Sequence, residues 1–449
     1  MQQPLQLRQS KEFLTLGTAD DKEVDAQHCS NYGSQPDRGS TRHLFDKRCS
    51  AGGGGLDMPL ISDLSEADSP VEQKQIEEYP NRPSYPLRVA YDAQAFLSPN
   101  RGLGKGVQLR SLLGPYLDTF AGFATRGQNY SEQRLIQRGL PRYQLWHQLS
   151  LPYQLQQWGA DVFLAPYNTA PLFIPKRTKL ILVLHDLILL ERFKVPNLRK
   201  RMNNEFRRFL IPRAVSRAHT VLTVSSYSKQ QIVHHFPSAD VQVIPCTVGP
   251  SWFVGKHVRA FAERDNCILA VTGDVPHKNP QRALEGYAAL VAQSDRSTVP
   301  HLRVVGMSGS MQKFRSWAEM LKVSDLVHVE PYLTEGQLQD LYRRSRAVLF
   351  PSLMEGFGIP VLEAMASGTP VITSNTTSLP EVGGPAANYF DPTDVAGIAT
   401  ALKQVLDNPD RQQNMIELGV AQANKFHPDS VRLQIQAFWD ALAATPSSR

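Results

Sequence analysis

The chain has 449 residues, of which 41% are hydrophobic, and its 48 Lys and Arg against 42 Asp and Glu give a formal charge of +6. This length predicts about two domains with sizeable cores. The positive excess is mild and is not interleaved with aromatic residues on one element, which disfavours a nucleic-acid binder and fits an enzyme that handles phosphates or works near anionic lipid.

The first 84 residues differ in composition from the rest of the chain. They lack apolar periodicity, contain a glycine run at 52–55 and end in a proline-rich stretch at 79–86. We predict a disordered tail over residues 1–84, with a small additional domain as the alternative.

Residues 87–250 alternate between short apolar strands and helical patterns. The strands are predicted at 87–91, 161–165, 179–184, 220–224 and 241–244, and the helices at 107–117, 199–217 and after a Ser225/Ser226 cap. The helix at 199–217 is amphipathic, with Met202, Phe206 and Phe209 at helical spacing.

The same alternation restarts after residue 264. The strands are predicted at 267–272, 302–305, 326–329, 347–350 and 370–373, and the helices at 279–293, 312–321, 337–345, 360–366 and 394–406. Strands that alternate with helices indicate parallel sheets built from βαβ units.

The fold class is therefore α/β, with two Rossmann-like, doubly wound domains that face a central cleft. We place the N-terminal domain at 85–255 and the C-terminal domain at 256–428. A last helix within 429–449 has an apolar face, and we expect it to cross back to the first domain. Ligands of such sheets bind at the carboxyl ends of the strands.

The most informative stretch is 350–384, FPSLMEGFGIPVLEAMASGTPVITSNTTSLPEVGG. Its glycine-containing loop lets backbone N–H groups approach a ligand, and Pro360 predicts that a helix begins there. The N-terminus of that helix favours an anion. We expect Glu363 in the first helical turn, so that it and Glu355 flank a phosphate-sized gap. A surface loop followed by a dipole-stabilised Glu is the alternative.

This stretch resembles the E-x7-E motif of the family 4 (group 1) glycosyltransferases, which are retaining enzymes of the GT-B fold. The resemblance implies that Glu355 is catalytic and binds hydroxyls of the transferred sugar. It implies that the amides of Gly356, Phe357 and Gly358 hold the donor diphosphate, and that Glu363 binds the ribose.

Two segments of the first half extend the resemblance. The sequence RGLGKG at 101–106 is similar to the family's first-domain glycine loop, which implies that Gly104 lies at the donor diphosphate; a flexible loop is the alternative. His185 begins the sequence HDL after a buried strand, where the family often has a His near the sugar, and this implies a catalytic role. A hydrogen-bonded core histidine is the alternative.

Two segments of the second half of the chain complete the resemblance. In GDVPHKN at 273–279, Lys278 matches the family's diphosphate-binding lysine, whereas Asp274 stands where many members carry an Arg. A solvated loop lysine is the alternative. The segment 331–333 resembles the one that contacts the nucleobase, which implies nucleobase roles for Tyr332 and Leu333. A packed loop aromatic is the alternative for Tyr332.

The resemblance as a whole implies a glycosyltransferase that moves a hexose from a nucleoside-diphosphate sugar to a hydroxyl of a sugar, polysaccharide or lipid-linked acceptor. The chain has no Asp-x-Asp pair, so we expect no metal, and no cofactor besides the sugar nucleotide as co-substrate. The glycine loop, HDL and PHKN resemble a mannosyltransferase-like subgroup, which favours GDP-mannose. We expect no nucleic-acid partner.

Two alternatives stay open. One is a sugar synthase or epimerase of the same fold, and the other is a catalytically degenerate module that only binds nucleotide sugars, which Asp274 favours. A dehydrogenase is disfavoured, because neither block has the fingerprint glycines directly after its first strand.

The cellular location follows from weaker signals. Cys29, Cys49, Cys246 and Cys267 show no metal-type spacing, which predicts a reducing compartment. We expect a cytoplasmic protein, since the sequence has no signal peptide and no stretch of about 18 apolar residues. The basic run at 199–213 could bind an anionic membrane or an acidic acceptor, but a solvated helix face is favoured.

Overall fold

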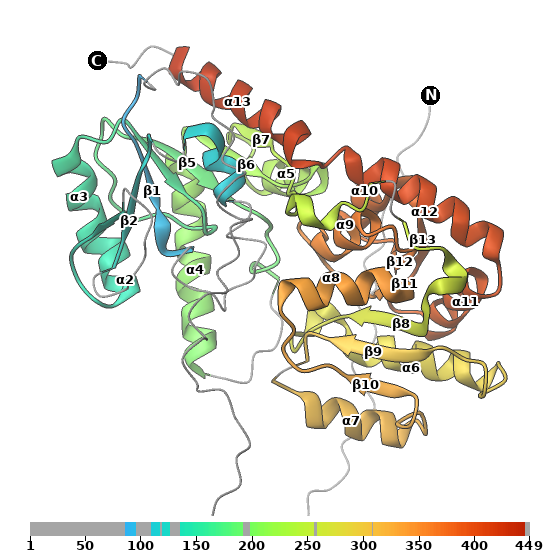
Figure 1. The fold of residues 1–449 in the computed structure, drawn as a ribbon. Helices are drawn as coiled ribbons and strands as arrows, with labels where there is room; N and C mark the ends of the chain where they lie inside the picture. The colour runs from blue at the N-terminus through green and yellow to red at the C-terminus, as the bar shows by residue number, and fades with distance from the viewer. Residues whose placement is uncertain are drawn as a thin grey trace, which may run out of the picture. The chain divides into compact units, whose positions relative to one another are not determined.

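The computed structural model describes residues 86–95, 109–116, 119–125, 135–191, 198–255, 258–307 and 309–444. The predicted disordered tail and Gly104 lie outside these residues. Residues 80–449 belong to one compact unit, and within it the chain forms two parallel sheets (Figure 1).

The first sheet has seven strands, all parallel, in the order β3-β2-β1-β4-β5-β6-β7. They are β1 Val89–Asp92, β2 Ala121–Ala124, β3 Leu135–Gln137, β4 Val162–Ala165, β5 Lys179–Val183, β6 Thr220–Thr223 and β7 Val241–Val243. The sequence analysis missed β2 and β3. The latter is three residues long, and its side chains are only half-buried, so it carries little apolar signal.

The second sheet has six parallel strands in the order β10-β9-β8-β11-β12-β13. They are β8 Asp265–Val271, β9 His301–Val305, β10 Val327–Val329, β11 Ser345–Phe350, β12 Val371–Ser374 and β13 Ala387–Phe390. Apart from β13, each had been predicted to within two residues. Both sheets reverse their strand order next to the first strand of the block, as doubly wound folds do, and the predicted fold class is confirmed.

The first sheet is covered by helices on both faces. Helices α2 Tyr143–Leu145 and α3 Leu151–Trp158 are joined by a π-helical turn, Trp146–Ser150, and with α4 Leu198–Arg217 they pack on one face. The opposite face is covered by α13 Pro428–Ala444. On that face the indole of Trp439 donates a hydrogen bond of 2.8 Å to the carbonyl of Leu112.

Helix α4 is buried along a different side from the one its spacing suggested. The side chains that enter the core are Leu210, Ile211, Ala214 and Val215. Met202, Phe206 and Phe209, the apolar stripe seen in the sequence, are exposed. The stripe is therefore real, but it faces away from the sheet.

The remaining helices are α5 Ser226–His235 in the first half, and in the second half α6 Pro280–Ala292, α7 Met311–Met320, α8 Glu335–Arg344, α9 Ile359–Ala366, α10 Leu379–Gly383, α11 Val395–Leu406 and α12 Pro409–Asn424. The stretch PEVGG at 380–384 lies within the short helix α10 and its C-terminal end. Helices α6, α7 and α11 pack on one face of the second sheet, and α8, α9, α10 and α12 contribute to the core on the other.

Candidate active site

The loop between β11 and α9 carries the E-x7-E segment, and hydroxyl groups that follow β12 hold it in place. The amide of Glu355 donates to the Thr377 hydroxyl at 3.1 Å. The Ser378 hydroxyl donates to the carbonyls of Glu355 and Phe357 at 3.0 and 2.8 Å. Because these bonds fix the backbone on both sides of Gly356, the loop is rigidly shaped before any ligand binds.

The two ends of the loop are fixed by packing and by backbone conformation. The Phe357 side chain is buried and packs edge-on against Phe426, with ring centroids 5.5 Å apart. Gly358 is the N-cap of α9 and has a φ of +109°, which L side chains rarely adopt. Phe357 can therefore offer only its backbone to a ligand, and the first amides of α9, which have no partner inside the helix, follow directly.

The ammonium group of Lys278 lies 2.7 Å from a carboxylate oxygen of Glu355. Lys278 ends a 3-10 turn, Pro276–Lys278, that follows β8, so the carboxyl ends of two neighbouring strands bring the pair together. Both side chains are mostly buried, at 24% and 12% exposed. The pair therefore places a carboxylate oxygen and an ammonium nitrogen side by side at the strand ends.

His185 follows β5 and approaches the same loop from the first sheet. Its Nε2 lies 3.1 Å from the carbonyl of Pro166, and its amide donates to the side chain of Asn168 at 2.9 Å. A Cβ atom built on Gly356 would lie only 2.7 Å from the His185 carbonyl oxygen. His185 therefore lies directly beside the E-x7-E loop, and only glycine fits at position 356.

Two serines of the first half also reach this loop. The hydroxyls of Ser225 and Ser228 donate to the carbonyl of Gly356 at 2.7 and 3.2 Å. The Glu381 carboxylate of α10 accepts from the amides of Ser226 and Tyr227, at the N-terminus of α5. The sequence analysis noted the Ser225/Ser226 cap, but it gave no indication that these residues would contact the loop.

Asp186 and His277 are further members of the site that the sequence analysis did not single out. The Asp186 side chain approaches the place that a side chain on Gly356 would occupy. Burial lowers the pKa of His277, whereas the charge of Glu355 raises it and that of Lys278 lowers it. Both residues belong to segments that had been noted, HDL and PHKN, and this was the available signal.

Glu363 lies in the second turn of α9, not in the first as expected, because the helix begins at Ile359 and not at Pro360. Its carboxylate accepts a hydrogen bond of 2.7 Å from the hydroxyl of Tyr342 in α8. Burial raises the pKa of Glu363 from 4.5 to about 7, and the Tyr342 hydrogen bond opposes this shift. The carboxyl group therefore changes charge near neutral pH.

Asp274 stands where the resemblance predicts an arginine, and its side chain has a partner within the protein. One of its carboxylate oxygens accepts a 2.8 Å hydrogen bond from the amide of Gly309, which ties the loop after β8 to the loop after β9. Asp274 also lines a cavity of about 640 Å³ that contains Arg282 and Lys313. Lys278 and Glu355 do not line this cavity.

The two residues expected at the nucleobase follow β10. Tyr332 is 77% exposed, and Leu333 packs against the core that includes Phe357 and Tyr342. Leu333 is therefore close to the elements that carry the E-x7-E segment.

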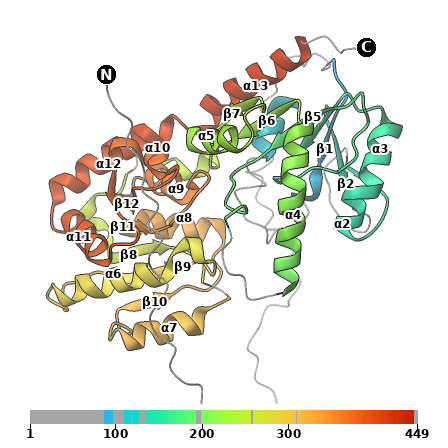
Figure 2. The same ribbon diagram turned by 180° about the vertical axis from the view of Figure 1, so that it is seen from behind.

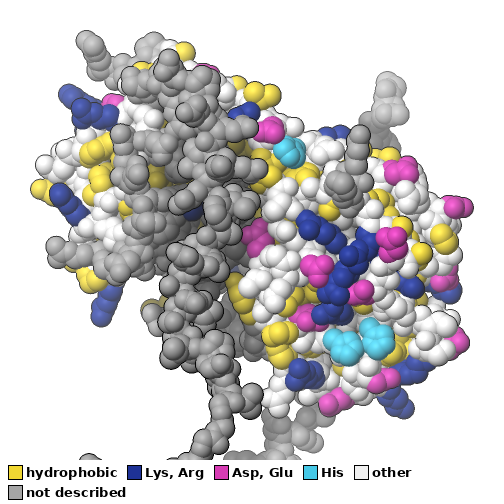
Figure 3. Space-filling model, in the orientation of Figure 1, with side chains coloured by type: hydrophobic (Ala, Val, Ile, Leu, Met, Phe, Trp, Pro, Cys, Tyr) yellow, Lys and Arg dark blue, Asp and Glu magenta, His cyan; other side chains and the backbone are white. Residues whose placement is uncertain are grey.

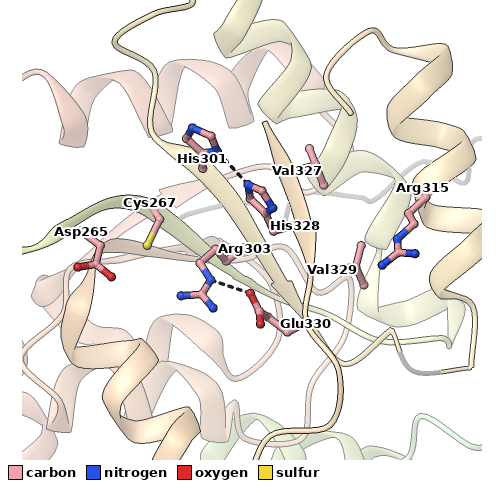
Figure 4. A pocket seen from close by; sticks show the side chains of 9 residues that line it. All are labelled: Asp265, Cys267, His301, Arg303, Arg315, Val327, His328, Val329 and Glu330. Carbon is pink, nitrogen blue, oxygen red and sulfur yellow. Dashed lines mark hydrogen bonds and ion pairs between the residues drawn. The ribbon is translucent and has the colours of Figure 1, made fainter. Parts of the chain in front are cut away.

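A second polar cavity, of about 540 Å³, lies over β8, β9 and β10 (Figure 4). In this cavity Nδ1 of His301 lies 3.0 Å from Nε2 of His328. Nε of Arg303 lies 2.6 Å from Oε1 of Glu330. Figure 3 shows Lys and Arg side chains, carboxylates and histidines gathered on this side of the molecule. None of the predicted site residues lines this cavity.

The described residues hold no group of three or more His, Cys, Asp and Glu side chains that could bind a metal ion. None of the helices in this part of the chain is long and apolar enough to span a membrane.

Comparison with known families agrees with this geometry. Residues 256–421 match the model described as "Glycosyl transferases group 1", and residues 112–252 match "Glycosyltransferase Family 4". Together the two matches include both sheets from β2 onward. The two sheets of this chain thus match the group 1 and family 4 glycosyltransferases.

Two curated relatives are bacterial mannosyltransferases. The chain is 31% identical to the MMP α-(1→4)-mannosyltransferase of Mycolicibacterium hassiacum, over 50% of this chain and 54% of that protein. It is 33% identical to the O-antigen chain mannosyltransferase RfbU of Salmonella typhimurium, over 45% of this chain and 55% of that protein. The chain thus spans about half the length of these curated relatives.

Solved structures show the same fold at lower identity. The sucrose-phosphate synthase of Thermosynechococcus elongatus matches with a TM-score of 0.62 and 17% identity, over 80% of this chain and 100% of that one. WaaG, a glycosyltransferase involved in lipopolysaccharide biosynthesis, matches with a TM-score of 0.59 and 16% identity, over the same shares. These likenesses establish the fold alone.

Proposed function

We propose that this protein is a retaining, metal-independent glycosyltransferase that moves a hexose from a nucleoside-diphosphate sugar to a hydroxyl of a carbohydrate or lipid-linked acceptor. The observation that carries the proposal is the Lys278–Glu355 pair, held at the carboxyl ends of β8 and β11 beside His185. It sets a carboxylate for sugar hydroxyls next to a cation for phosphate.

The leaving group of this reaction is a nucleoside diphosphate, on which negative charge develops. Lys278 is placed to balance that charge, together with the amides of Gly356 to Gly358 and the N-terminus of α9. Stabilisation of this kind is effective because the hydroxyls of Ser378 and Thr377 already fix the loop, so little reorganisation is needed during the reaction.

Glu355 and His185 are proposed to contact the transferred sugar. A carboxylate with two acceptor oxygens suits vicinal hydroxyls. In the proposed reaction the departing phosphate oxygen takes the proton of the acceptor hydroxyl on the same face, so the protein supplies mainly position and charge stabilisation.

Glu363 is proposed to bind the ribose hydroxyls, and Tyr332 and Leu333 to contact the base. The hydrogen bond from Tyr342 supports the first assignment, because it orients the carboxylate and favours its charged, accepting form. Gly104 is proposed at the diphosphate on the family resemblance alone.

GDP-mannose is the proposed donor. The support is that the relatives above are named as mannosyltransferases, together with the HDL and PHKN sequences. A lipid-linked acceptor would bring the protein to the inner face of the membrane.

The test is thermal unfolding of the full chain with GDP, UDP, ADP, dTDP and NAD, each at millimolar concentration. A ligand at about 100 times its Kd adds ~2.7 kcal/mol to the free energy of unfolding, which raises Tm by a few degrees. We expect GDP alone to do so. A shift with another diphosphate would correct the base, and a shift with none would contradict the proposal.

A second candidate is a module that binds nucleotide sugars without transferring them. Asp274 favours it, because a carboxylate bonded to Gly309 replaces a cation that many family members use. A GDP shift in Tm combined with no release of GDP from GDP-mannose, across a panel of mannosyl acceptors, would support this candidate over transfer.

A further inference from the structure

The outward side of α4 is apolar. Leu198, Met202, Phe206 and Phe209 repeat at intervals of three and four residues, and each is exposed, Leu198 and Met202 at 68% and 67%. The buried residues of α4, from Leu210 onward, project from the opposite side. Four large apolar side chains thus form one solvent-facing stripe.

The neighbouring helical segment, Tyr143–Trp158, has a similar stripe. Its buried residues Trp146, Leu151 and Leu155 enter the same core as those of α4. Leu145, Leu149 and Tyr153 are exposed. Because both helical segments cover the same face of the first sheet, their exposed stripes point away from that face in common.

One hydrogen bond joins the two helical segments, and another joins the C-terminal end of α4 to the stretch between β4 and β5. The side chain of Gln144 donates to that of Asn203 at 3.3 Å, and Arg217 donates to the carbonyl of Ile174 at 3.3 Å. The exposed Phe173 lies next to Ile174. We call the eight exposed side chains the apolar face: Leu145, Leu149, Tyr153, Phe173, Leu198, Met202, Phe206 and Phe209. Grouped exposed apolar residues of this kind mark an interaction surface.

Helix α4 carries an excess of positive charge. Helix α4 has seven Lys and Arg residues and one acidic residue, Glu205, which is paired with Arg208. The guanidinium of Arg213 lies 3.6 Å above the ring of Phe209. Helix α4 therefore combines an exposed apolar stripe with an excess of positive charge.

The first half of α4 is less buried than the second among the described residues. None of its described side chains before Leu210 is fully buried, and the N-terminal half extends beyond the strands of the first sheet (Figures 1 and 2). A short helix is marginal in water without a packed face. A partner that takes up the apolar stripe would stabilise this half.

We propose that the apolar face and the basic residues of α4 dock the protein on an anionic lipid bilayer. The apolar side chains enter the region between headgroups and acyl chains, and the Lys and Arg residues pair with lipid phosphates. A second copy fits less well, because two such helices face to face would bring like charges together. Nucleic acid would leave the apolar face in water.

The experiment is flotation of the full chain with vesicles of phosphatidylglycerol and phosphatidylcholine, compared with phosphatidylcholine alone. We expect binding to the anionic vesicles only, weakened by about tenfold or more between low and 0.5 M salt. The assay needs no donor or acceptor, so its failure would leave the proposed sugar transfer untouched.

Matched variants separate the apolar and charged contributions. The double variant Leu198→Gln/Met202→Gln should bind about tenfold more weakly or worse. Its control is Leu433→Gln/Met320→Gln, whose residues are 65% and 71% exposed but lie on α13 and α7. For charge, Arg201→Gln/Arg213→Gln should weaken binding by a similar factor, and Arg315→Gln/Lys229→Gln should not.

Three results would overturn the proposal. These are no binding of the wild-type chain to anionic vesicles, equal binding of the variants and the wild type, or equal loss in the variants and their controls. Light scattering is measured in parallel. A dimer that Leu198→Gln/Met202→Gln dissociates, with no vesicle binding, would identify a second copy as the occupant.

Discussion

Helices α4 and α13 lie on opposite faces of the first sheet, and both have an apolar stripe at helical spacing. In α13 the residues of the stripe, Val431, Ile435, Phe438, Trp439 and Leu442, are buried. In α4 the stripe that the sequence shows is exposed. The same periodicity is thus buried in one helix and exposed in the other. The spacing of apolar residues therefore identifies the apolar side of a helix, but it does not show whether another part of the protein covers that side.

The largest expected effect tests the buried side of this comparison. Trp439→Ala removes an indole that is fully buried and bonded to the Leu112 carbonyl. We expect it to lower the free energy of unfolding by ~3–5 kcal/mol, because it leaves a cavity and an unpaired carbonyl. Urea denaturation measures the change. A loss below about 1 kcal/mol would mean that α13 does not pack as described.

A mostly buried carboxylate and an exposed one can be compared in the same way. Glu355→Ala should lower turnover by about 100-fold or more, because it removes the proposed contact with the reacting sugar and leaves Lys278 without its partner. The control is Glu319→Ala, an exposed carboxylate of α7, which should leave turnover unchanged. Initial rates of mannosyl transfer measure both. Wild-type-like turnover in Glu355→Ala would refute the assignment.

Two glycines, one tightly surrounded and one in open space, allow the same comparison for the backbone. A Cβ at Gly356 would meet the His185 carbonyl, whereas one at Gly336, in α8, would meet nothing within 4 Å. We expect Gly356→Ala to lower the free energy of unfolding by ~1–3 kcal/mol and to impair nucleotide binding. Gly336→Ala should be neutral, or stabilising by up to ~1 kcal/mol. Equal effects in chemical denaturation would contradict the close approach of His185.

The pKa of Glu363, about 7 against its usual 4.5, gives a pH dependence. Because the folded state holds this proton more tightly than the unfolded chain, the group's contribution to stability is full below pH 4.5 and is lost as the pH rises through about 7. If the ionised form binds the ribose, nucleotide affinity changes in the opposite direction and should be roughly tenfold lower at pH 6 than at pH 8.

Tyr342→Phe sharpens this test. It removes a hydrogen bond that lowers the pKa of Glu363, so the rise of affinity should move to higher pH. Glu363→Gln should abolish the rise. Calorimetric titration with GDP between pH 5.5 and 8.5 measures all three proteins. An affinity that is independent of pH in the wild-type chain would exclude the ribose role.

The smallest effect tests the exposed side of the comparison. Met202→Ala removes an exposed side chain from the apolar face, and Ala is at least as good a helix former. We expect the free energy of unfolding in water to change by less than about 0.5 kcal/mol. A loss near that of Trp439→Ala would show that Met202 is packed against protein in solution.

The sequence by itself determined the two α/β blocks and the E-x7-E segment, because buried parallel strands and glycine loops before helices leave local patterns. The sequence did not predict the weak or short strands β2, β3 and β13. Local patterns also placed His185, Lys278 and Glu355 after strands, where the ends of parallel strands converge.

Only the tertiary structure decided which groups meet. The contacts of Ser225, Ser228 and Glu381 link residues that lie more than 120 positions apart, and no local pattern encodes such pairs. The bond of Asp274 to Gly309, the charge of Glu363 and the exposure of the α4 stripe were likewise decided by the surroundings. Burial and pKa depend on what surrounds a side chain in space, and neighbours in the sequence supply only part of that surrounding.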